Sequence, residues 1–317
     1  MGWWRGRVEG DTTVVGGHSP LERCLMLCRL CQSKEAVKNS HIIPKFVSSW
    51  LKETSQLRGL RNVELPNLRQ EDTTKIPLLC SECEEKRLSP KEGLFAEEIF
   101  YPFNDEGRLE FTYSDWLLYF AVSLSWRVGE SLLEKVRNQN SDMASHVEIA
   151  LSDWGNFLLG KPSKSGQYAH HLFFDCMYHC RMRVGPYYDE RYALRTIDYA
   201  IPYSDERVAV YVKLPGLVFF SGVYPADPTG WKNTRILNNG RMTASGQEVK
   251  DPLFWGYMRD SVSSIPQLMN AMSDRQKRKL EERMKTAPPR SKLRRERSKN
   301  RGPQTGRLTR WRMSCMG

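Results

Sequence analysis

Two pairs of cysteines constrain the fold of this chain more than any other feature. Cys28 and Cys31 form one C-x2-C pair, and Cys80 and Cys83 form a second. Two such pairs can place four thiolates around one ion, and a tetrahedron of sulfur ligands favours zinc over other divalent metals. We therefore expect one structural zinc site that ties the two segments together. The alternative is that the pairs are unrelated buried residues; Cys24 is a competing ligand, but it lacks the two-residue spacing.

A short motif between the two pairs adds a chemical group. The run Ser40-His41-Ile42-Ile43-Pro44 places one imidazole near the end of a predicted strand, because proline cannot continue a hydrogen-bonded ladder. A neutral imidazole can accept a proton from water near pH 7. His41 is therefore a candidate general base. The alternative is a histidine that only makes a hydrogen bond at a strand end.

The order of these motifs resembles the zinc-stapled HNH (ββα-metal) nuclease family, and more narrowly bacterial proteins with a Ser-His-Ile-Ile-Pro core and a larger domain behind it. The similarity covers residues 26–103, about a quarter of the chain. The resemblance implies that the zinc is structural and that a separate divalent ion, Mg²⁺ or Mn²⁺, lies between the strand and the final helix. It also implies that His41 is the general base.

Two positions depart from the pattern of that family. The residue before the base is usually Asp or His and binds the catalytic metal, but here it is Ser40. The residue after the last cysteine is usually His or Asn, but here it is Glu84. Serine is a poor metal ligand, whereas a carboxylate suits Mg²⁺ or Mn²⁺. The implied site is therefore either rebuilt around Glu84, with Ser40 beside it, or catalytically silent.

Basic side chains near these motifs are candidate nucleic-acid contacts. Arg58 and Arg61 lie in a long polar connection, a kind of segment that is often functional in compact domains. Lys86 and Arg87 follow the second cysteine pair. A solvated loop and an exposed turn explain these side chains equally well.

The segment after the second cysteine pair carries a helix-start signal. Ser89, Pro90 and Glu92 match a capping box with proline at the first helical position. We therefore expect a helix from Ser89 to about Phe100. We prefer this structural role for Glu92 to that of a metal ligand.

The residue pattern of the rest of the chain predicts a second region that contains both helices and strands. Apolar periodicity indicates helices over 114–136 and 142–159, and short β-branched and aromatic runs indicate strands over 172–174, 193–201, 207–214 and 217–224. Residues 251–285 look helical, with an interruption near Pro266. His170, His171, Cys176, His179 and Cys180 could form a second metal site, but their spacing matches no known ligand pattern, and alternation of core side chains explains Cys176 and Cys180.

The predicted class is α+β: a small zinc-stapled ββα-metal module, then a mixed helical and antiparallel-sheet domain, then a disordered basic tail. The predicted divisions are a flexible arm (1–25), the module (26–103), the second domain (111–286) and the tail (287–317).

Charge is distributed unevenly between the body and the tail. The net charge is +11, but residues 274–317 hold 16 Lys and Arg against four Asp and Glu, a surplus of 12. The rest of the chain therefore carries about −1. Only the tail or a local patch can supply the positive potential that would attract nucleic acid. The tail is either a nucleic-acid-binding arm or a solvated extension.

No apolar run of 18 residues and no secretory h-region is visible, so we expect a cytoplasmic protein without a membrane span. In a reducing compartment the eight cysteines are metal ligands or core residues rather than disulfides.

The sequence therefore predicts a metal-dependent endonuclease that hydrolyses DNA, or less favourably RNA, with His41 as general base and Glu84 as a ligand of the catalytic ion. The alternative is a silent zinc-binding module that docks nucleic acid or a protein partner. A third hypothesis is a regulatory or defence component whose second domain controls the first.

Overall fold

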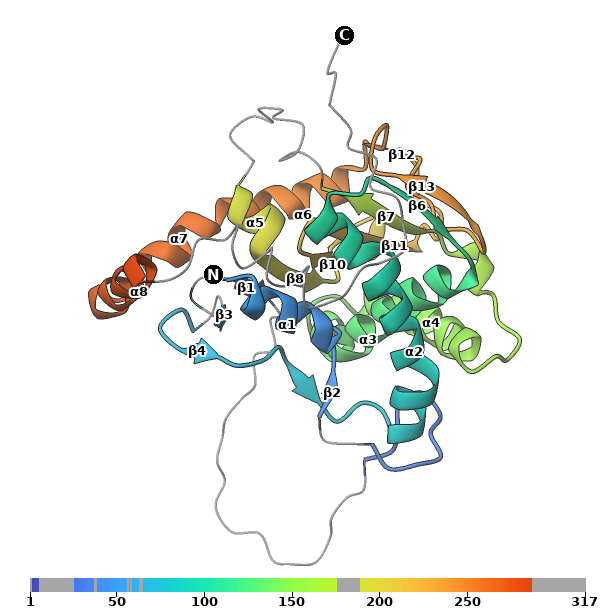
Figure 1. Ribbon diagram of the computed structural model, residues 1–317. Coiled ribbons are helices and arrows are strands. Elements are labelled where there is room, and N and C mark those ends of the chain that lie inside the picture. The colour runs from blue at the N-terminus through green and yellow to red at the C-terminus, as the bar shows by residue number, and fades with distance from the viewer. Residues whose placement is uncertain are drawn as a thin grey trace, which may run out of the picture.

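An eight-stranded mixed sheet lies at the centre of the fold (Figure 1). The structure is a computed structural model that describes residues 2–5, 26–36, 39–55, 57, 59–62, 65–175 and 189–286. Seven strands follow the order β4-β3-β1-β8-β10-β11-β7, and β9 pairs with β10. β1 runs parallel to both neighbours, and the other pairs in this sheet are antiparallel. The sheet strands are β1 (Gly2–Arg5), β3 (Leu60–Asn62), β4 (Arg69–Gln70), β7 (His170–Phe174), β8 (Thr196–Ala200), β9 (Tyr203–Ser204), β10 (Arg207–Leu214) and β11 (Leu217–Tyr224).

Helices cover both faces of this sheet, which explains why β10 and β11 are almost continuously apolar. Alternate residues of a strand point to opposite faces. Val210 and Val212 of β10 belong to the larger core, which includes side chains of α3 and α4, whereas Ala209 and Tyr211 pack with side chains of α6. The helices outside the metal-binding region are α3 (Asp115–Gln139), α4 (Ser141–Leu158), α5 (Glu190–Arg195), α6 (Pro252–Ser263), α7 (Ile265–Asn270), α8 (Asp274–Thr286) and the 3₁₀ turn η4 (Ser165–Gln167).

A tight turn of two residues, Pro215 and Gly216, joins β10 to β11. Gly216 has φ of 71°, a conformation that glycine adopts without a steric penalty at the third position of a type II turn. A Cβ atom there would also lie 2.6 Å from a ring carbon of Phe103. The turn therefore requires glycine for its backbone and for its packing.

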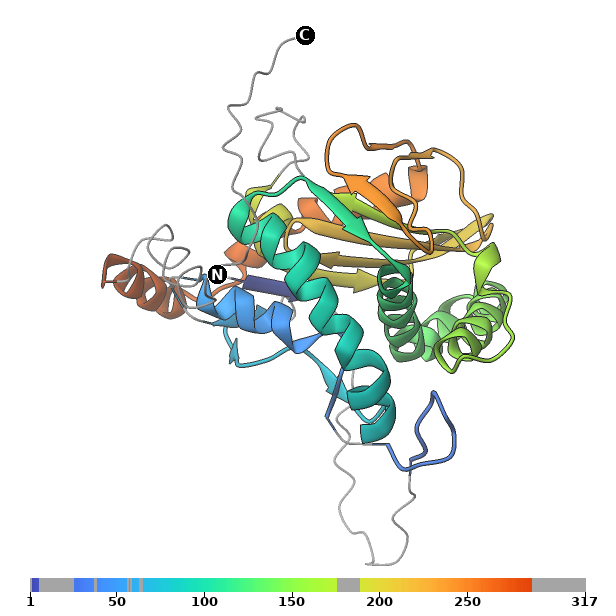
Figure 2. The ribbon, with the colours of Figure 1, turned by 45° about the vertical axis from the view of Figure 1, so that its right-hand side comes forward.

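One helical run follows the second cysteine pair and crosses the molecule (Figure 2). Its parts are η1 (Cys83–Leu88), α2 (Ser89–Phe95), η2 (Ala96–Phe100) and η3 (Pro102–Glu106), of which the η segments are π-helical. Phe100 meets Phe46 of α1 (Lys45–Glu53) edge-on at 5.2 Å, and Phe95 stacks on Phe120 of α3 at 4.1 Å. The run is therefore packed between α1 and α3.

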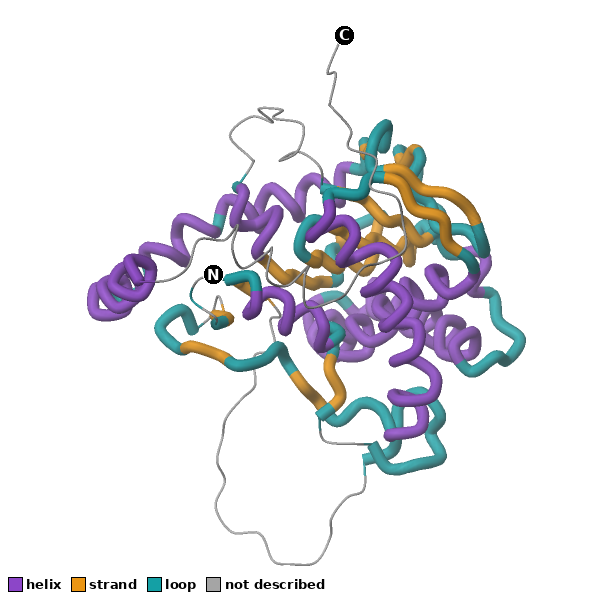
Figure 3. The backbone as a smooth tube through the Cα atoms, viewed as in Figure 1, coloured by secondary structure: helices purple, strands orange, loops and turns teal. Residues whose placement is uncertain are grey.

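A pair of short strands that are far apart in the sequence lies beside the start of this run (Figure 3). Its strands β2 (Ser40–His41) and β5 (Lys75–Ile76) are antiparallel, with Ser40 opposite Ile76 and His41 opposite Lys75. Two further pairs stand apart from the main sheet: β6 (Glu110–Tyr113) with β13 (Gly240–Thr243), and β12 (Trp231–Lys232) with β14 (Glu248–Val249).

The predicted helices and strands of the second region are largely confirmed. The ranges 207–214 and 217–224 are strands at the predicted bounds, and the two long helices begin and end within three residues of prediction. The predicted strand 193–201 begins only at Thr196, because Asp189 caps the preceding helix α5 by accepting hydrogen bonds from two backbone amides.

Two local predictions were wrong. Ser89 is the first residue of α2 but not a helix N-cap, because its φ and ψ of −55° and −38° place it inside the helical run that starts upstream. The arm predicted over 1–25 includes Gly2–Arg5, which pair as β1 between β3 and β8, a partnership that only the tertiary fold supplies. Residues 6–25 and the predicted tail 287–317 lie outside the described residues.

The core crosses the predicted domain boundary. One cluster of buried apolar side chains extends from Cys28 to Ala244 and includes residues of both predicted domains. The boundaries themselves stay a prediction. No helix in the described part of the chain is long and apolar enough to cross a lipid bilayer.

Candidate metal centre and the histidine beside it

The four cysteines Cys28, Cys31, Cys80 and Cys83 converge on one point. Their Sγ atoms all lie within 4.8 Å of one another, and those of Cys31 and Cys80 are 3.8 Å apart. A tetrahedron with a zinc–sulfur distance of about 2.3 Å has edges of about 3.8 Å. The donor set and its spacing therefore fit a metal ion such as zinc.

Local backbone bonds build each half of this centre. The amide of Gln32 donates to the carbonyl of Cys28 and closes the first turn, and the amide of Arg29 donates to the carbonyl of Leu78 at 2.9 Å. That second bond joins the first turn to the segment leading into Cys80. An ion pair between Lys34 and Glu82 links the two halves again at the surface.

The thiols have unequal proton affinities. Burial alone would raise the pKa of Cys31, but hydrogen bonds from Ser33 and the neighbouring cysteines outweigh it and lower the pKa to about 6. Burial raises the pKa of Cys28 and, more strongly, that of Cys83. Three or four thiolates so close together repel one another, and a divalent cation removes that repulsion when it displaces the protons.

His41 lies on β2 and is held by Asp72. Its Nε2 atom is 3.0 Å from Oδ2 of Asp72. The carboxylate also accepts hydrogen bonds from Ser48 at 2.9 Å and from Lys75 at 2.9 Å. Burial alone would raise the pKa of Asp72, but these hydrogen bonds hold it well below its ordinary value. An ionised Asp72 therefore accepts the Nε2 proton and orients the ring.

Ser40 and Glu84 meet on the other side of β2. The buried hydroxyl of Ser40 donates to Oε2 of Glu84 at 2.9 Å and accepts from the amide of Leu79 at 3.1 Å. Neighbouring residues of a strand point to opposite faces, so Ser40 and His41 have separate partners. The structure thus brings Glu84 to Ser40 and His41 to Asp72, and within the described residues no side-chain hydrogen bond or ion pair joins these two pairs.

A buried arginine joins strand β2 to the helical run. Arg127 of α3 is 1% exposed, and its Nη1 atom lies 2.7 Å from Oε1 of Glu92 and 3.2 Å from the carbonyl oxygen of His41. Glu92 therefore compensates the buried charge of Arg127. Its structural role is this ion pair and not the helix capping that the sequence predicted.

Among the residues that the structure describes, the four cysteines are the one group of three or more His, Cys, Asp or Glu side chains close enough to share an ion. Glu84 and Ser40 do not gather a third such ligand. His170 and His171 are buried on β7, where they contact Ser221 and Thr234, and Cys176, His179 and Cys180 lie outside the described ranges.

The basic candidates occupy different environments. Arg61 is buried, with Nη1 donating to the carbonyl of Pro66 at 2.7 Å, so it is poorly placed to reach a phosphate. Lys86 and Arg87 are exposed on η1. Arg58 lies outside the described residues.

Sequence reasoning missed three residues that matter here, Asp72, Ser48 and Arg127. The local signal for Asp72 was weak: a carboxylate three positions before Lys75 in a polar run. Only the pairing of β2 with β5 shows that this carboxylate reaches His41. Arg127 lies in a helix whose pattern reads simply as core.

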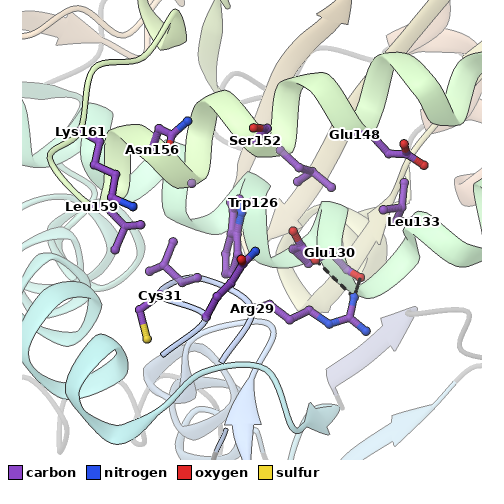
Figure 4. Close-up of a pocket in the computed structure, with 14 residues that line it drawn as sticks. Arg29, Cys31, Trp126, Glu130, Leu133, Glu148, Ser152, Asn156, Leu159 and Lys161 are labelled. Carbon is purple, nitrogen blue, oxygen red and sulfur yellow. Dashed lines mark hydrogen bonds and ion pairs between the residues drawn. The ribbon is translucent and has the colours of Figure 1, made fainter. Parts of the chain in front are cut away.

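A cavity of about 310 Å³ separates the first cysteine turn from α3 and α4 (Figure 4). Arg29 reaches across it and pairs with Glu130 of α3 at 3.3 Å, while Cys31 lies at its edge. Burial raises the pKa of Glu130 in spite of this arginine. The first turn is thus attached to α3 by an ion pair as well as to Cys80 and Cys83 by the thiol cluster.

Comparison with known proteins adds no family to this geometry. No protein-family model matches the chain, and neither the curated proteins nor the solved structures contain a significant match to it.

Proposed function

We propose that this protein is an HNH-type endonuclease that hydrolyses phosphodiester bonds of DNA, or less favourably RNA, with His41 as general base. The observation that carries the proposal is the contact between His41 Nε2 and Asp72 Oδ2, 3.0 Å long, at the β2–β5 strand pair, whose strand β5 leads into Cys80 of the four-cysteine cluster. In this proposal the cysteines hold a structural zinc ion.

The placement of the two cysteine pairs supports the proposal. Strands β2 and β5 pair with each other although α1, β3 and β4 lie between them in the chain, and the helical run follows β5. Cys28 and Cys31 precede β2, and Cys80 and Cys83 lie at the start of the helical run. A metal bound by both pairs would fix the β2–β5 pair against this run. That rigidity is what a base needs if it is to hold one position relative to a substrate phosphate.

The chemistry of His41 follows from its partner. Because Asp72 accepts the proton on Nε2, the Nδ1 atom is the one that can take a proton from water. The resulting hydroxide attacks phosphorus, the bond between phosphorus and the 3′ oxygen breaks, and that oxygen leaves and takes up a proton from solvent. Asp72 stabilises the imidazolium until it returns its proton to solvent. Lys75 and Ser48 keep Asp72 ionised and in place by their hydrogen bonds.

The described residues do not present a ready site for a catalytic Mg²⁺ or Mn²⁺ ion. Glu84 is engaged by Ser40, and no third hard ligand joins them. The divalent metal requirement and the ligand role of Glu84 stay predictions that an assay must test.

The contact between Ser40 and Glu84 favours a second candidate function. A zinc-stabilised module without a catalytic ion would dock nucleic acid or a protein partner and cut nothing. The hydrogen bond between Ser40 and Glu84 supports this candidate, because it gives the carboxylate a structural role.

A cleavage assay separates the two candidates. Supercoiled plasmid and single-stranded DNA are incubated with purified protein and Mg²⁺, Mn²⁺ or Ni²⁺, with wild type compared with His41→Ala. Loss of metal-dependent cutting in a variant that keeps its zinc and its melting temperature supports the nuclease. Absence of cutting by folded, zinc-loaded wild type contradicts it and favours the docking module.

A further inference from the structure

A second cavity, of about 630 Å³, opens between the helical run and the facing ends of α3 and α4. Its walls come from segments far apart in the sequence. Arg87 and Lys91 come from the helical run, Tyr119 from α3 and Phe157 from α4. Asn238 and Asn239 come from the loop before β13.

Two cations line one wall without an acidic partner. Arg87 and Lys91 are four residues apart along the helical run, and within the described part of the chain neither forms an ion pair. Lys91 Nζ lies 6.0 Å from the centre of the Tyr119 ring. Unpaired guanidinium and ammonium groups in a concave site attract a phosphate or another anion.

Two aromatic rings form another wall. The centres of Tyr119 and Phe157 are 5.9 Å apart at an interplanar angle of 42°, and both rings are only half-buried. The hydroxyl of Tyr119 donates to the carbonyl of Leu158 at 2.9 Å, which holds the ring in place. Partly exposed rings of this kind give a planar base a surface for stacking.

The remaining wall is polar. Asn238 and Asn239 offer side-chain donors and acceptors, and the carboxylate of Asp115 suits hydroxyl or amino groups. An inorganic anion would use only the cations, and an uncharged ring would use only the aromatic wall.

We propose that this cavity binds a nucleotide unit, with its phosphate on Arg87 and Lys91 and its base against Phe157 and Tyr119. The nucleotide is either free or part of a single strand. This site does not depend on catalysis by His41, because the cavity lining includes neither His41 nor Asp72.

Calorimetric titration of the full-length, zinc-loaded protein without added Mg²⁺ tests the proposal. The probes are adenosine 5′-monophosphate, adenosine and inorganic phosphate. We expect adenosine 5′-monophosphate to bind more tightly than either half. Arg87→Ala and Lys91→Ala should each weaken its binding by about tenfold or more. Phe157→Leu should weaken binding of the nucleotide but not of inorganic phosphate.

Lys86→Ala is the matched comparison, because Lys86 is exposed on the same turn but does not line the cavity. We expect it to keep full affinity for the nucleotide. Equal losses in Lys86→Ala and Arg87→Ala would show attraction by charge alone and overturn the proposal. Equal affinity for the nucleotide and inorganic phosphate would also overturn it.

Competition distinguishes the two sources of the ligand. If a single-stranded oligoadenylate displaces the mononucleotide at lower concentration, the site accepts a strand; if the mononucleotide is preferred, the site accepts a free nucleotide. Because binding is measured and not cleavage, a failure here leaves the role of His41 untouched, and an inactive His41→Ala variant should still bind.

Discussion

The imidazole of His41 and the carboxylate of Asp72 are 3.0 Å apart, although 31 positions separate them in the sequence. The pairing of β2 with β5 brings them together. Asp72 stays ionised because His41, Lys75 and Ser48 donate to it, and these contacts hold its pKa well below the ordinary value against the opposing effect of burial. The pair is therefore an imidazole oriented through Nε2, which leaves Nδ1 as the nitrogen that can accept a proton.

The first prediction concerns this pair. Asp72→Asn should lower the cleavage rate by about a hundredfold or more, because the ring loses both its orientation and the charge that stabilises the imidazolium. The rate is measured under single-turnover conditions across a range of pH. Lys75→Met is the control, since it removes another partner of Asp72 and leaves His41 in contact. Equal losses in both variants would contradict a specific role for the pair.

The second prediction concerns the metal. Cys80→Ser removes one of four converging thiols, so zinc content measured by mass spectrometry should fall. Stability should drop by about 3–5 kcal/mol, or roughly 10 °C in melting temperature. A strong chelator should reproduce the loss in wild type. Cys24→Ser removes a cysteine that lacks the two-residue spacing of the pairs, so this variant should keep its zinc. Full zinc and normal melting of Cys80→Ser would disprove the four-cysteine assignment.

The parts of this fold that the sequence predicted depend on local patterns. The C-x2-C spacing fixes each cysteine turn by itself, and the apolar runs of 207–214 and 217–224 identify strands because both faces of the sheet are covered. The long helix after Ser114 follows from its periodicity. In each case the residues that carry the signal are neighbours along the chain.

The parts that it missed depend on tertiary contacts. Nothing near Asp72 in the sequence identifies His41 as its partner, and nothing near Arg127 identifies Glu92. The capping box at Ser89 failed because a helix entering from Cys83 already occupied that position. A local motif predicts a helix start only where no upstream helix overrides it.

The third prediction concerns the buried ion pair. Glu92→Gln leaves the charge of Arg127, 1% exposed, without its carboxylate and should cost about 3–5 kcal/mol in the free energy of unfolding. The double variant Glu92→Leu/Arg127→Met buries no charge and should recover most of that loss. Denaturant unfolding of both variants and wild type measures this. A double variant less stable than Glu92→Gln would show that the arginine stabilises the fold independently of Glu92.

The last prediction concerns acid stability. Burial lowers the pKa of His170 and of His171 to about 3, against about 6.5 in an unfolded chain. Between these values the unfolded state binds protons that the folded state excludes, so stability falls as the pH drops through this window and levels off below it. Each imidazole contributes about 1.4 kcal/mol per pH unit.

Replacing His170 tests this dependence. His170→Asn keeps a hydrogen-bonding group for Ser221 but cannot titrate, so the fall in stability between pH 6 and 4.5 should be shallower by about 1.4 kcal/mol per pH unit. Ser221→Ala is the control, because it removes the hydrogen bond, keeps the imidazole and should shift stability without changing the slope.

Loss of metal from the cysteines in acid affects all variants alike and cancels in the comparison. Measurements stop at pH 4.5, because Asp72 begins to lose its stabilising contribution below about pH 4. An unchanged slope in His170→Asn would show that His170 does not remain neutral in the folded protein.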